Sequence, residues 1–293
     1  MHTTRQQRGA TLLLGVVILL IIAGLASFAY FVFGNTKHKL TVDTSMTARF
    51  ARIDGALAEF VAAHRRLPCP ALGTDNSSAV TAGVEQPATP GGACNPSNQS
   101  TGVVPWVTLG LTEDEILDAW NARISYRVQP SLASGTLLLM NMSWCDPAGT
   151  TNATVGAALA CNAPCTGAAC RNPLNYLYGK GLAVQDRAGN WLNQPAPAWA
   201  GAPTPPPLST GAAYVLISHG PNGLSSYNSN GTPRSQPAGF ELNNANGRPL
   251  LGTTIFIDDV RNTGGAVYFD DMLSHPTITT VLERAALASR TPH

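Results

Sequence analysis

Cysteine is the reactive residue type whose spacing says most in this chain. The sequence of 293 residues contains six cysteines, and all of them follow its long apolar stretch. An even number of cysteines set among proline, asparagine and glycine is typical of disulfides formed in an oxidising compartment. Six thiols allow about 15 pairings, so the connectivity stays open. The loop that Cys69 and Cys94 could close makes them the preferred local pair, and the others are Cys145, Cys161, Cys165 and Cys170.

A structural zinc site is the alternative use of the cysteine cluster. The segment CNAPCTGAAC places Cys161, Cys165 and Cys170 close together. Structural zinc sites normally combine Cys-x-x-Cys pairs with one another or with histidines. This segment contains neither, so disulfides in an extracytoplasmic head are the favoured interpretation.

Ser218 and His219 are neighbours at the end of an apolar stretch, and a serine activated by a base can act as a nucleophile. Successive side chains of a strand point to opposite faces, so these two are poorly placed to meet. The sequence also lacks the G-x-S-x-G and H-E-x-x-H motifs. We therefore predict that the chain is not an enzyme, and that residues 220–223 form a turn.

Two pairs of adjacent carboxylates could offer ligands to a hard cation. They are Asp258 with Asp259, and Asp270 with Asp271. Calcium needs several oxygen ligands and net negative charge. Adjacent acids also occur on ordinary solvated surfaces, so the sequence predicts no firm metal site and keeps calcium only as an alternative to having no cofactor.

The composition names no partner. Lysine and arginine number 18 against 17 acidic residues, so no excess of positive charge indicates nucleic acid. Charged residues make up 12% of the chain, well below the roughly 25% of ordinary soluble domains. The 28 glycines and 22 prolines stand mostly in the later part, which indicates an apolar segment followed by a loop-rich head.

The apolar segment extends from Ala10 to Phe33 without a charged residue. As a helix it would be roughly 36 Å long, enough for the hydrocarbon core of a bilayer. The apolar core of a cleavable secretory signal is shorter, roughly 7 to 15 residues. The sequence therefore predicts a single transmembrane helix, and the cysteines place the following head in the periplasm.

The helical pattern continues beyond this segment. Apolar residues recur at intervals of three and four, as in an amphipathic helix; they include Val42, Met46, Phe50, Ile53 and Leu57. The helix is expected to end at Leu67, because Pro68 disfavours helical backbone in the residue before it.

The N-terminal region resembles type IV pilins and the pseudopilins of type II secretion. The resemblance rests on the basic leader RQQRG, the apolar helix ATLLLGVVILLIIAGLASFAY and its amphipathic continuation. In that family, prepilin peptidase removes the leader after its glycine and methylates the new N-terminus. The resemblance implies cleavage between Gly9 and Ala10 and methylation of Ala10, with Arg5 and Arg8 as the basic residues of the leader.

Two positions depart from the pattern of that family. The first mature residue is usually phenylalanine and here is Ala10; the fifth is usually glutamate and here is Leu14. The glutamate is thought to pair with the amine of a neighbouring subunit during assembly. Certain minor pilins and the pseudopilin that caps the filament resemble this chain in having an apolar residue there, so Leu14 favours a minor or tip subunit.

Four short motifs of the head occur in the same order in one group of prepilin-type proteins. Major pseudopilins have a calcium-binding loop that is similar to the third of these motifs, SHGPNG at 218–223. Asn222 stands where that loop has an acidic residue, and we therefore count Asn222 among the calcium candidates. The motifs are LPCPA at 67–71, PWVTLGL to DAW at 105–120, SHGPNG at 218–223 and FDD at 269–271.

Several further elements of the head are expected. Thr112 and Glu115 fit a capping box before a short helix. Alternating or apolar stretches predict strands, and helical spacing predicts a helix near the C-terminal end of the sequence. The expected strands are 123–128, 136–142, 212–218 and one near 266; the helix covers 278–287, and a proline-rich connector covers 195–207.

Together these features predict a pilin-like α+β fold, in which a long N-terminal helix with a transmembrane and an amphipathic half packs on a head with an antiparallel sheet. The predicted parts are the leader 1–9, the transmembrane part 10–33, the amphipathic continuation 34–67 and the disulfide-containing head 68–293.

The expected function is that of a minor pilin or pseudopilin subunit in a type IV pilus or a type II secretion pseudopilus. The expected partners are prepilin peptidase, other subunits, the inner-membrane assembly platform and inner-membrane lipid. The alternative is a signal-anchored periplasmic binding protein or adhesin-like module that never enters a filament.

Overall fold

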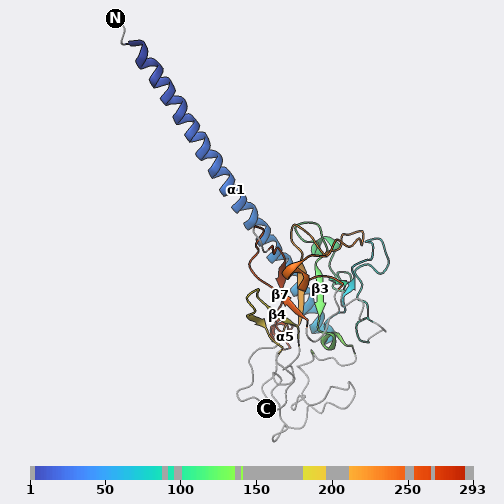
Figure 1. The fold of residues 1–293 in the computed structure, drawn as a ribbon. Helices are drawn as coiled ribbons and strands as arrows, with labels where there is room; N and C mark the ends of the chain where they lie inside the picture. Colours follow the sequence, from blue (N-terminus) through green and yellow to red (C-terminus); the bar gives the residue numbers. More distant parts are fainter. Residues whose placement is uncertain are drawn as a thin grey trace. The chain divides into compact units, whose positions relative to one another are not determined.

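A computed structural model of the chain describes residues 4–87, 92–95, 101–135, 140, 181–195, 211–247, 254–264 and 268–287. The chain divides into two compact units, Met1–Ala48 and Arg49–His293. Helix α1, Thr4–His64, contributes residues to both units, and its side chains are described at 16–25, 27 and 41–64. Figure 1 colours the chain from blue at the N-terminus to red at the C-terminus. The expected strand at 136–142, apart from Met140, and the connector beyond residue 195 lie outside the described residues.

Helix α1 ends at His64, three residues before the expected Leu67. The next residue, Arg65, has a φ of 57°, and its N–H donates to the carbonyl of Val61 at 2.8 Å. A residue in this left-handed conformation is a common end to a helix. The helix therefore ends before Leu67, the residue whose backbone conformation Pro68 restricts.

The last turns of α1 belong to the head. Phe50, Ile53, Leu57 and Val61 are buried, following the spacing of one helix face. Asp54 is buried on the same helix and accepts hydrogen bonds from Tyr214 Oη at 2.8 Å, Ser274 Oγ at 3.1 Å and Arg284 Nη1 at 3.2 Å. These three donors supply the compensation that a buried carboxylate requires.

The predicted fold class and localisation are wrong in their membrane-spanning part. Among the residues that the structure describes, no helix combines the length and the apolar character needed to cross a membrane. The transmembrane half at 10–33 and the single-pass placement in the bacterial inner membrane with a periplasmic head are corrected accordingly.

The larger sheet of the head has five antiparallel strands in the order β1-β2-β3-β6-β8. Strand β6 is buried at every position, and its residue Leu216 pairs with Tyr126 of β3. The predicted strands at 123–128 and 212–218 are confirmed by β3 and β6. The strands are β1 (Ala71–Leu72), β2 (Gly102–Val103), β3 (Ser125–Val128), β6 (Tyr214–Ser218) and β8 (Met272–Ser274).

A second sheet corrects the expectation of a single antiparallel sheet. Its order is β5-β4-β7, with β5 at Trp191–Asn193, β4 at Ala183–Gln185 and β7 at Ile255–Ile257. Strands β4 and β7 are parallel. An apolar cluster joins β4 and β7 to β6, and so links the two sheets; it comprises Leu182, Val184, Ala212, Val215, Ile217 and Phe256.

Four short helices complete the described part of the head. They are α3 (Glu113–Ile116), the 3-10 helices η1 (Pro130–Ala133) and η2 (Gly239–Asn243), and α5 (Ile278–Arg284). The capping box at α3 is confirmed, because the N–H of Thr112 donates to Glu115 Oε2 at 2.8 Å. Helix α5 lies within the expected 278–287.

Cys69 and Cys94 form a disulfide, the pair that the sequence analysis preferred. Between them, Glu85 accepts two hydrogen bonds from the Arg66 guanidinium, at 2.8 and 2.7 Å, and one from the N–H of Cys69 at 2.9 Å. The disulfide therefore closes the loop, and the ion pair ties it to Arg66, two residues after the end of α1. Cys145, Cys161, Cys165 and Cys170 lie outside the described residues.

Candidate metal centre

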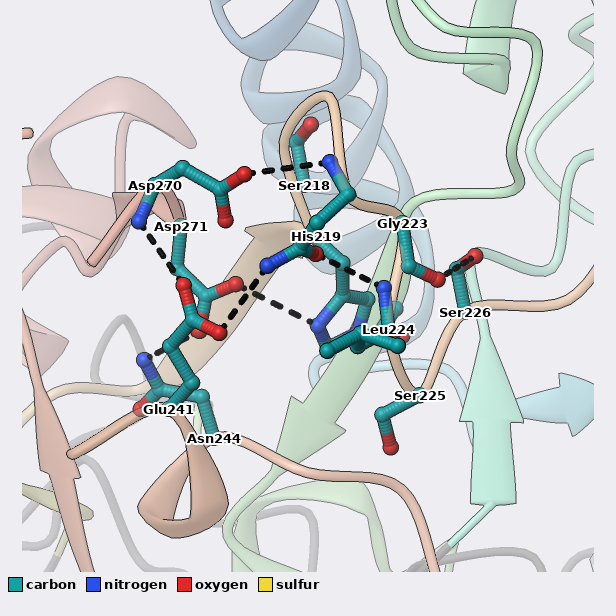
Figure 2. Close-up of polar contacts among 12 residues, drawn as sticks. Ser218, His219, Gly223, Leu224, Ser225, Ser226, Glu241, Asn244, Asp270 and Asp271 are labelled. Atoms are coloured by element: carbon teal, nitrogen blue, oxygen red, sulfur yellow. Dashed lines mark hydrogen bonds and ion pairs between the residues drawn. The ribbon is translucent and has the colours of Figure 1, made fainter. Parts of the chain in front are cut away.

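Three carboxylates from two distant segments of the head meet in its interior (Figure 2). Glu241 lies on η2, while Asp270 and Asp271 immediately precede β8. One ligand oxygen from each lies within 4.8 Å of the other two, and none of the three residues is more than 3% exposed. This buried acidic cluster could hold a metal ion.

The turn after β6 forms one wall of the cluster. The N–H of Gly223 donates to the carbonyls of His219 and Gly220, at 3.1 Å each, which confirms the turn predicted at 220–223. Gly220 has a φ of 61°, and a Cβ added there would lie 2.6 Å from Asp270 Cγ. Only glycine has neither the strain nor the clash at this position, and this lets the turn approach Asp270 closely.

Asp270 is fully buried, and only one of its two carboxylate oxygens accepts hydrogen bonds from the described residues. Its Oδ2 accepts from the N–H of Asn222 at 3.1 Å and from Tyr268 Oη at 2.6 Å. Its Oδ1 has no hydrogen-bond partner among the described residues. Leaving a buried acceptor without a partner costs free energy, which makes Oδ1 a candidate ligand atom of the cluster.

Glu241 is held between the turn and Asp270. Its Oε1 accepts from the N–H of Asp270 at 2.8 Å, and its Oε2 accepts from Asn222 Nδ2 at 3.1 Å. Burial, followed by the hydrogen bond to the Asp270 side chain, raises the pKa of Glu241 to about 8. The cluster therefore resists full ionisation at neutral pH unless positive charge enters it.

Asp271 connects the cluster to the main sheet through His219. Asp271 Oδ2 accepts from Asn244 Nδ2 at 2.8 Å, and its Oδ1 lies 3.5 Å from His219 Nδ1. His219 Nε2 lies 2.9 Å from the Ser125 hydroxyl on β3. His219 Nδ1 itself has no hydrogen-bond partner within the described part of the chain.

Ser125, His219 and Asp271 stand in the order of a nucleophile, its base and the acid that orients the base. Ser125 is completely buried, and Asn246 Nδ2 donates to its hydroxyl at 3.1 Å. Because this hydroxyl is buried among the described residues, we interpret the trio as a link between β3, the turn and the start of β8. The neighbouring Ser218 points elsewhere and donates to Asp118 Oδ2 at 2.8 Å, as expected for successive residues of a strand.

The fold brings together some of the candidate calcium ligands and separates others. Asp270 and Asp271 belong to the cluster, and Asn222 donates to it. Asp258 instead faces His275, with 3.0 Å between Oδ2 and Nε2. Asp259 is paired with Arg187, whose Nε lies 2.9 Å from Oδ2. Of the two acidic pairs, the fold therefore places Asp270 and Asp271 in the cluster, whereas Asp258 and Asp259 face His275 and Arg187.

Sequence reasoning missed Glu241, and it considered His219 only beside Ser218. A signal for Glu241 was present, because it is the sole acid of the segment GFELNNANG. A carboxylate in a stretch of asparagine and glycine, without a neighbouring base, is a reasonable candidate ligand. Ser125 gave no such signal, because its pairing with His219 follows from the alignment of β3 and β6.

The residues of the predicted leader site lie in α1. Arg5, Arg8, Gly9, Ala10 and Leu14 all fall within its bounds, and their side chains are not among those described. Comparisons with protein-family models, with curated proteins and with solved structures gave no match in any of the three.

Proposed function

We propose that this chain is a pilin-like structural subunit that assembles with other subunits through its N-terminal helix. The observation that supports this proposal is a run of large apolar side chains on α1 that are all exposed, from 43% for Val17 to 69% for Leu19. They are Val16, Val17, Ile18, Leu19, Leu20, Ile21, Ile22 and Leu25.

These side chains surround the helix. Successive residues are rotated by about 100°, so the consecutive positions Val16 to Ile22 point in every direction around the axis. A helix that binds one groove needs only one apolar stripe, whereas a helix that is apolar on all sides is buried on all sides. Several neighbouring helices are needed to provide that burial, and copies of related subunits in a filament core would provide them.

Burial of this segment offers enough free energy to drive assembly. Removing one large aliphatic side chain from water contributes about 1.5 to 3 kcal/mol. Eight such side chains are exposed in this segment. Association with several neighbours would bury most of them at once.

The leader and Leu14 support a particular kind of subunit among pilin-like proteins. We propose that prepilin peptidase cleaves between Gly9 and Ala10, and that Leu14 in place of the usual glutamate suits a minor or tip subunit of a type IV pilus or type II secretion pseudopilus. The proposed partners are the peptidase, other pilin-like subunits and the assembly platform.

We also propose that the ion of the acidic cluster is calcium. The three groups that share the cluster offer only carboxylate oxygens. Hard oxygen ligands suit calcium or magnesium rather than zinc or copper. Magnesium demands near-ideal octahedral geometry and usually keeps several waters, whereas calcium accepts irregular protein cages. A buried set of ligands supplied by the protein therefore favours calcium.

The filament proposal is tested in a bacterium that carries a complete pilus assembly system, with and without prepilin peptidase. Mass spectrometry should find methylated Ala10 as the N-terminus when the peptidase is present, and the uncut chain when it is deleted. Sheared filaments should contain the wild-type chain. The variant Leu19→Asp should be lost from them, because an isolated charge would be buried among apolar helices.

Val80→Asp is the matched control, because Val80 is 97% exposed in the head. It should enter filaments as the wild type does. An N-terminal mass that does not depend on the peptidase would contradict the proposal and favour an anchored binding module. Equal recovery of Leu19→Asp and the wild type in the filament fraction would also contradict it.

A further inference from the structure

We propose that Asn230 is a site of spontaneous covalent modification in the folded head, where its side-chain amide is converted to a carboxylate. The product weakens the contact between the turn 228–231 and the disulfide-bonded loop 69–94. This inference goes beyond the proposed filament subunit and the metal centre, because the reacting residues belong neither to the apolar segment of α1 nor to the acidic cluster.

The chemistry requires an asparagine followed by a glycine, and its only co-reactant is water. The backbone nitrogen of the glycine attacks Cγ of the asparagine, the new N–Cγ bond closes a succinimide ring, and the amide nitrogen leaves as ammonia. Water then opens the ring at either of its carbonyls, which gives aspartate or isoaspartate. Glycine favours the attack because it has no Cβ and adopts the widest range of backbone conformations.

The sequence contains three Asn-Gly pairs, at 222–223, 230–231 and 246–247, and the structure describes all of them. The third pair is held in the interior. Asn246 is 3% exposed, its Nδ2 donates to the Ser125 hydroxyl at 3.1 Å, and its Oδ1 accepts from the Arg127 guanidinium. Its amide cannot turn toward the glycine nitrogen without breaking these buried hydrogen bonds, which is costly.

The first pair is half-buried, and both of its reacting groups are engaged. Asn222 Nδ2 donates to Glu241 Oε2 at 3.1 Å, and Asn222 Oδ1 accepts from the N–H of Leu224 at 2.8 Å. The nucleophile is the nitrogen of Gly223, whose N–H donates to two carbonyls at 3.1 Å each. Reaction at this pair therefore requires the whole turn to open.

The pair at 230–231 is hindered least. Asn230 is exposed, and among the described residues its side chain makes one hydrogen bond, in which Oδ1 accepts from the N–H of Thr232 at 3.0 Å. This donor would stabilise the negative charge that develops on Oδ1 when Cγ is attacked. The N–H of Gly231 donates to the carbonyl of Asn228 at 2.9 Å and must be released first. Opening an exposed turn costs far less free energy than opening the core.

The turn that contains Asn230 packs on the disulfide-bonded loop. The carbonyl of Ser229 accepts from the N–H of Ser77 at 3.0 Å and from Arg123 Nη2 at 2.8 Å. Arg123 is completely buried, so its N–H groups have no access to water if Ser229 moves away. A buried donor that loses its partner destabilises the fold.

Isoaspartate would disturb this contact through the backbone. It inserts a methylene group into the main chain between Cα of residue 230 and the nitrogen of Gly231. A Cβ added to Gly231 would clash with the carbonyl oxygen of Thr74, so the turn has no space on that side for a longer backbone. The added length should therefore displace Ser229 from Arg123.

The site is tested on the purified full chain, kept in solution with a mild detergent and incubated in a warm, mildly alkaline buffer. Peptide mapping by mass spectrometry follows the loss of the amide at each Asn-Gly pair, in native buffer and in concentrated urea. In urea the three pairs should react at similar rates, because each has the same glycine. In native buffer Asn230 should react at least about tenfold faster than Asn222 and Asn246, which the fold protects.

The consequence for stability is tested on the isoaspartate fraction, separated from the unmodified chain by ion-exchange chromatography. Its Tm should be several degrees below that of fresh wild type. Asn230→Asp is the matched control, because it carries the new charge on an ordinary backbone, and its Tm should stay close to that of the wild type. Asn230→Gln should keep its Tm during incubation, because its side chain would have to close a less favourable six-membered ring.

Three outcomes would overturn the inference. The first is a native-state rate at Asn222 or Asn246 that equals or exceeds the rate at Asn230. The second is an unmodified Asn230 in native buffer after a time in which the chain in urea has reacted completely. The third is an isoaspartate fraction with the same Tm as fresh wild type.

Discussion

Asp118 shows how one buried carboxylate can organise a turn. Its Oδ1 accepts from the N–H groups of Trp120 and Ala122, at 2.9 Å each, and its Oδ2 accepts from Ser218 Oγ at 2.8 Å. Burial raises the pKa of Asp118, although these hydrogen bonds oppose the shift. The residue therefore connects the end of α3 to β6, and its burial makes its ionised form less favourable than in water.

The raised pKa of Asp118 predicts a pH dependence of stability with a definite sign. An acid whose pKa is higher in the folded than in the unfolded state stabilises the fold at low pH, and this contribution is lost as the pH rises through the folded pKa. The wild type should therefore lose stability relative to Asp118→Asn as the pH rises from about 3.8 upward. Urea denaturation of both proteins across that range measures the difference.

The matched control for this prediction is Asp186→Asn, because Asp186 is not buried and its hydrogen bonds with Asn190 lower its pKa. Its stability difference from the wild type should change with pH in the opposite direction. A constant difference between the wild type and Asp118→Asn at all pH values would show that burial does not shift this carboxyl.

Residue-level prediction from the sequence worked where the chemistry was local. Asp270 and Asp271 were identified as oxygen donors because they are adjacent, and Asn222 because it lies in a recognisable turn. Glu241 was missed because its distance from Asp270 depends on how η2 packs, which no local pattern specifies. Asp258 and Asp259 looked equivalent to the other pair until their partners, His275 and Arg187, were known.

At the scale of elements, the turn after β6 depends on glycine for two reasons that can be separated. Gly220 has a φ of 61°, and an added Cβ would lie 2.6 Å from Asp270 Cγ and from the Asp270 carbonyl. Gly189 has a φ of 88°, but its added Cβ would meet no atom within 4 Å. Both glycines have a positive φ, but only Gly220 lies so close to other atoms that a Cβ would clash with them.

Alanine at these two glycines should therefore have unequal effects. Gly189→Ala should cost about 1 kcal/mol of unfolding free energy, from backbone strain alone. Gly220→Ala should cost more, about 2 to 4 kcal/mol, because overpacking is added to the strain. Chemical denaturation of both variants and the wild type provides the comparison, and equal losses would mean that the turn can move away from Asp270.

The elements recovered from the sequence were those with strong local signals. Strand β6 was predicted because it is a continuous apolar run buried on both faces, and α3 because Thr112 and Glu115 form a capping box. The second sheet was not predicted. Strands β4 and β7 are three residues each, too short for a periodic pattern, and because they pair in parallel between Ala183–Gln185 and Ile255–Ile257 no hairpin turn joins them.

At the scale of the whole molecule, the disulfide closes a loop on the head that is also tied by Glu85. The bridge joins residues separated by 25 positions, and cross-linking a loop of this length stabilises a fold by about 3 kcal/mol. The ion pair between Arg66 and Glu85 should keep the loop in place without the bridge. A variant without the disulfide should therefore fold, but with a lower free energy of unfolding than the wild type.

The double variant Cys69→Ser with Cys94→Ser should accordingly lower the unfolding free energy by about 3 kcal/mol, with a circular dichroism spectrum close to that of the wild type. Urea denaturation without reductant gives the measurement. Adding reductant to this variant should not reduce its stability as much as it does that of the wild type. No difference between the variant and the oxidised wild type would contradict a stabilising role for the bridge.

The prediction for the molecule as a whole was wrong about its relation to the membrane. In the sequence, the uncharged apolar segment ends at Phe33. The two compact units of the structure meet between Ala48 and Arg49. Hydropathy identifies where a segment becomes polar. The boundary of a packed unit depends instead on which helix residues contact the strands, and that is a property of the folded head.

The bonds of Asp54 also constrain the order in which the head can be completed on the ribosome. Its partners Ser274 and Arg284 follow it by 220 and 230 residues. At about 5 to 20 residues per second, synthesis needs roughly 10 to 45 s to reach them. During that time the apolar face of α1 that carries Leu57 and Val61 has emerged without its final partners, so the nascent chain should depend on a chaperone until its last strand and helix arrive.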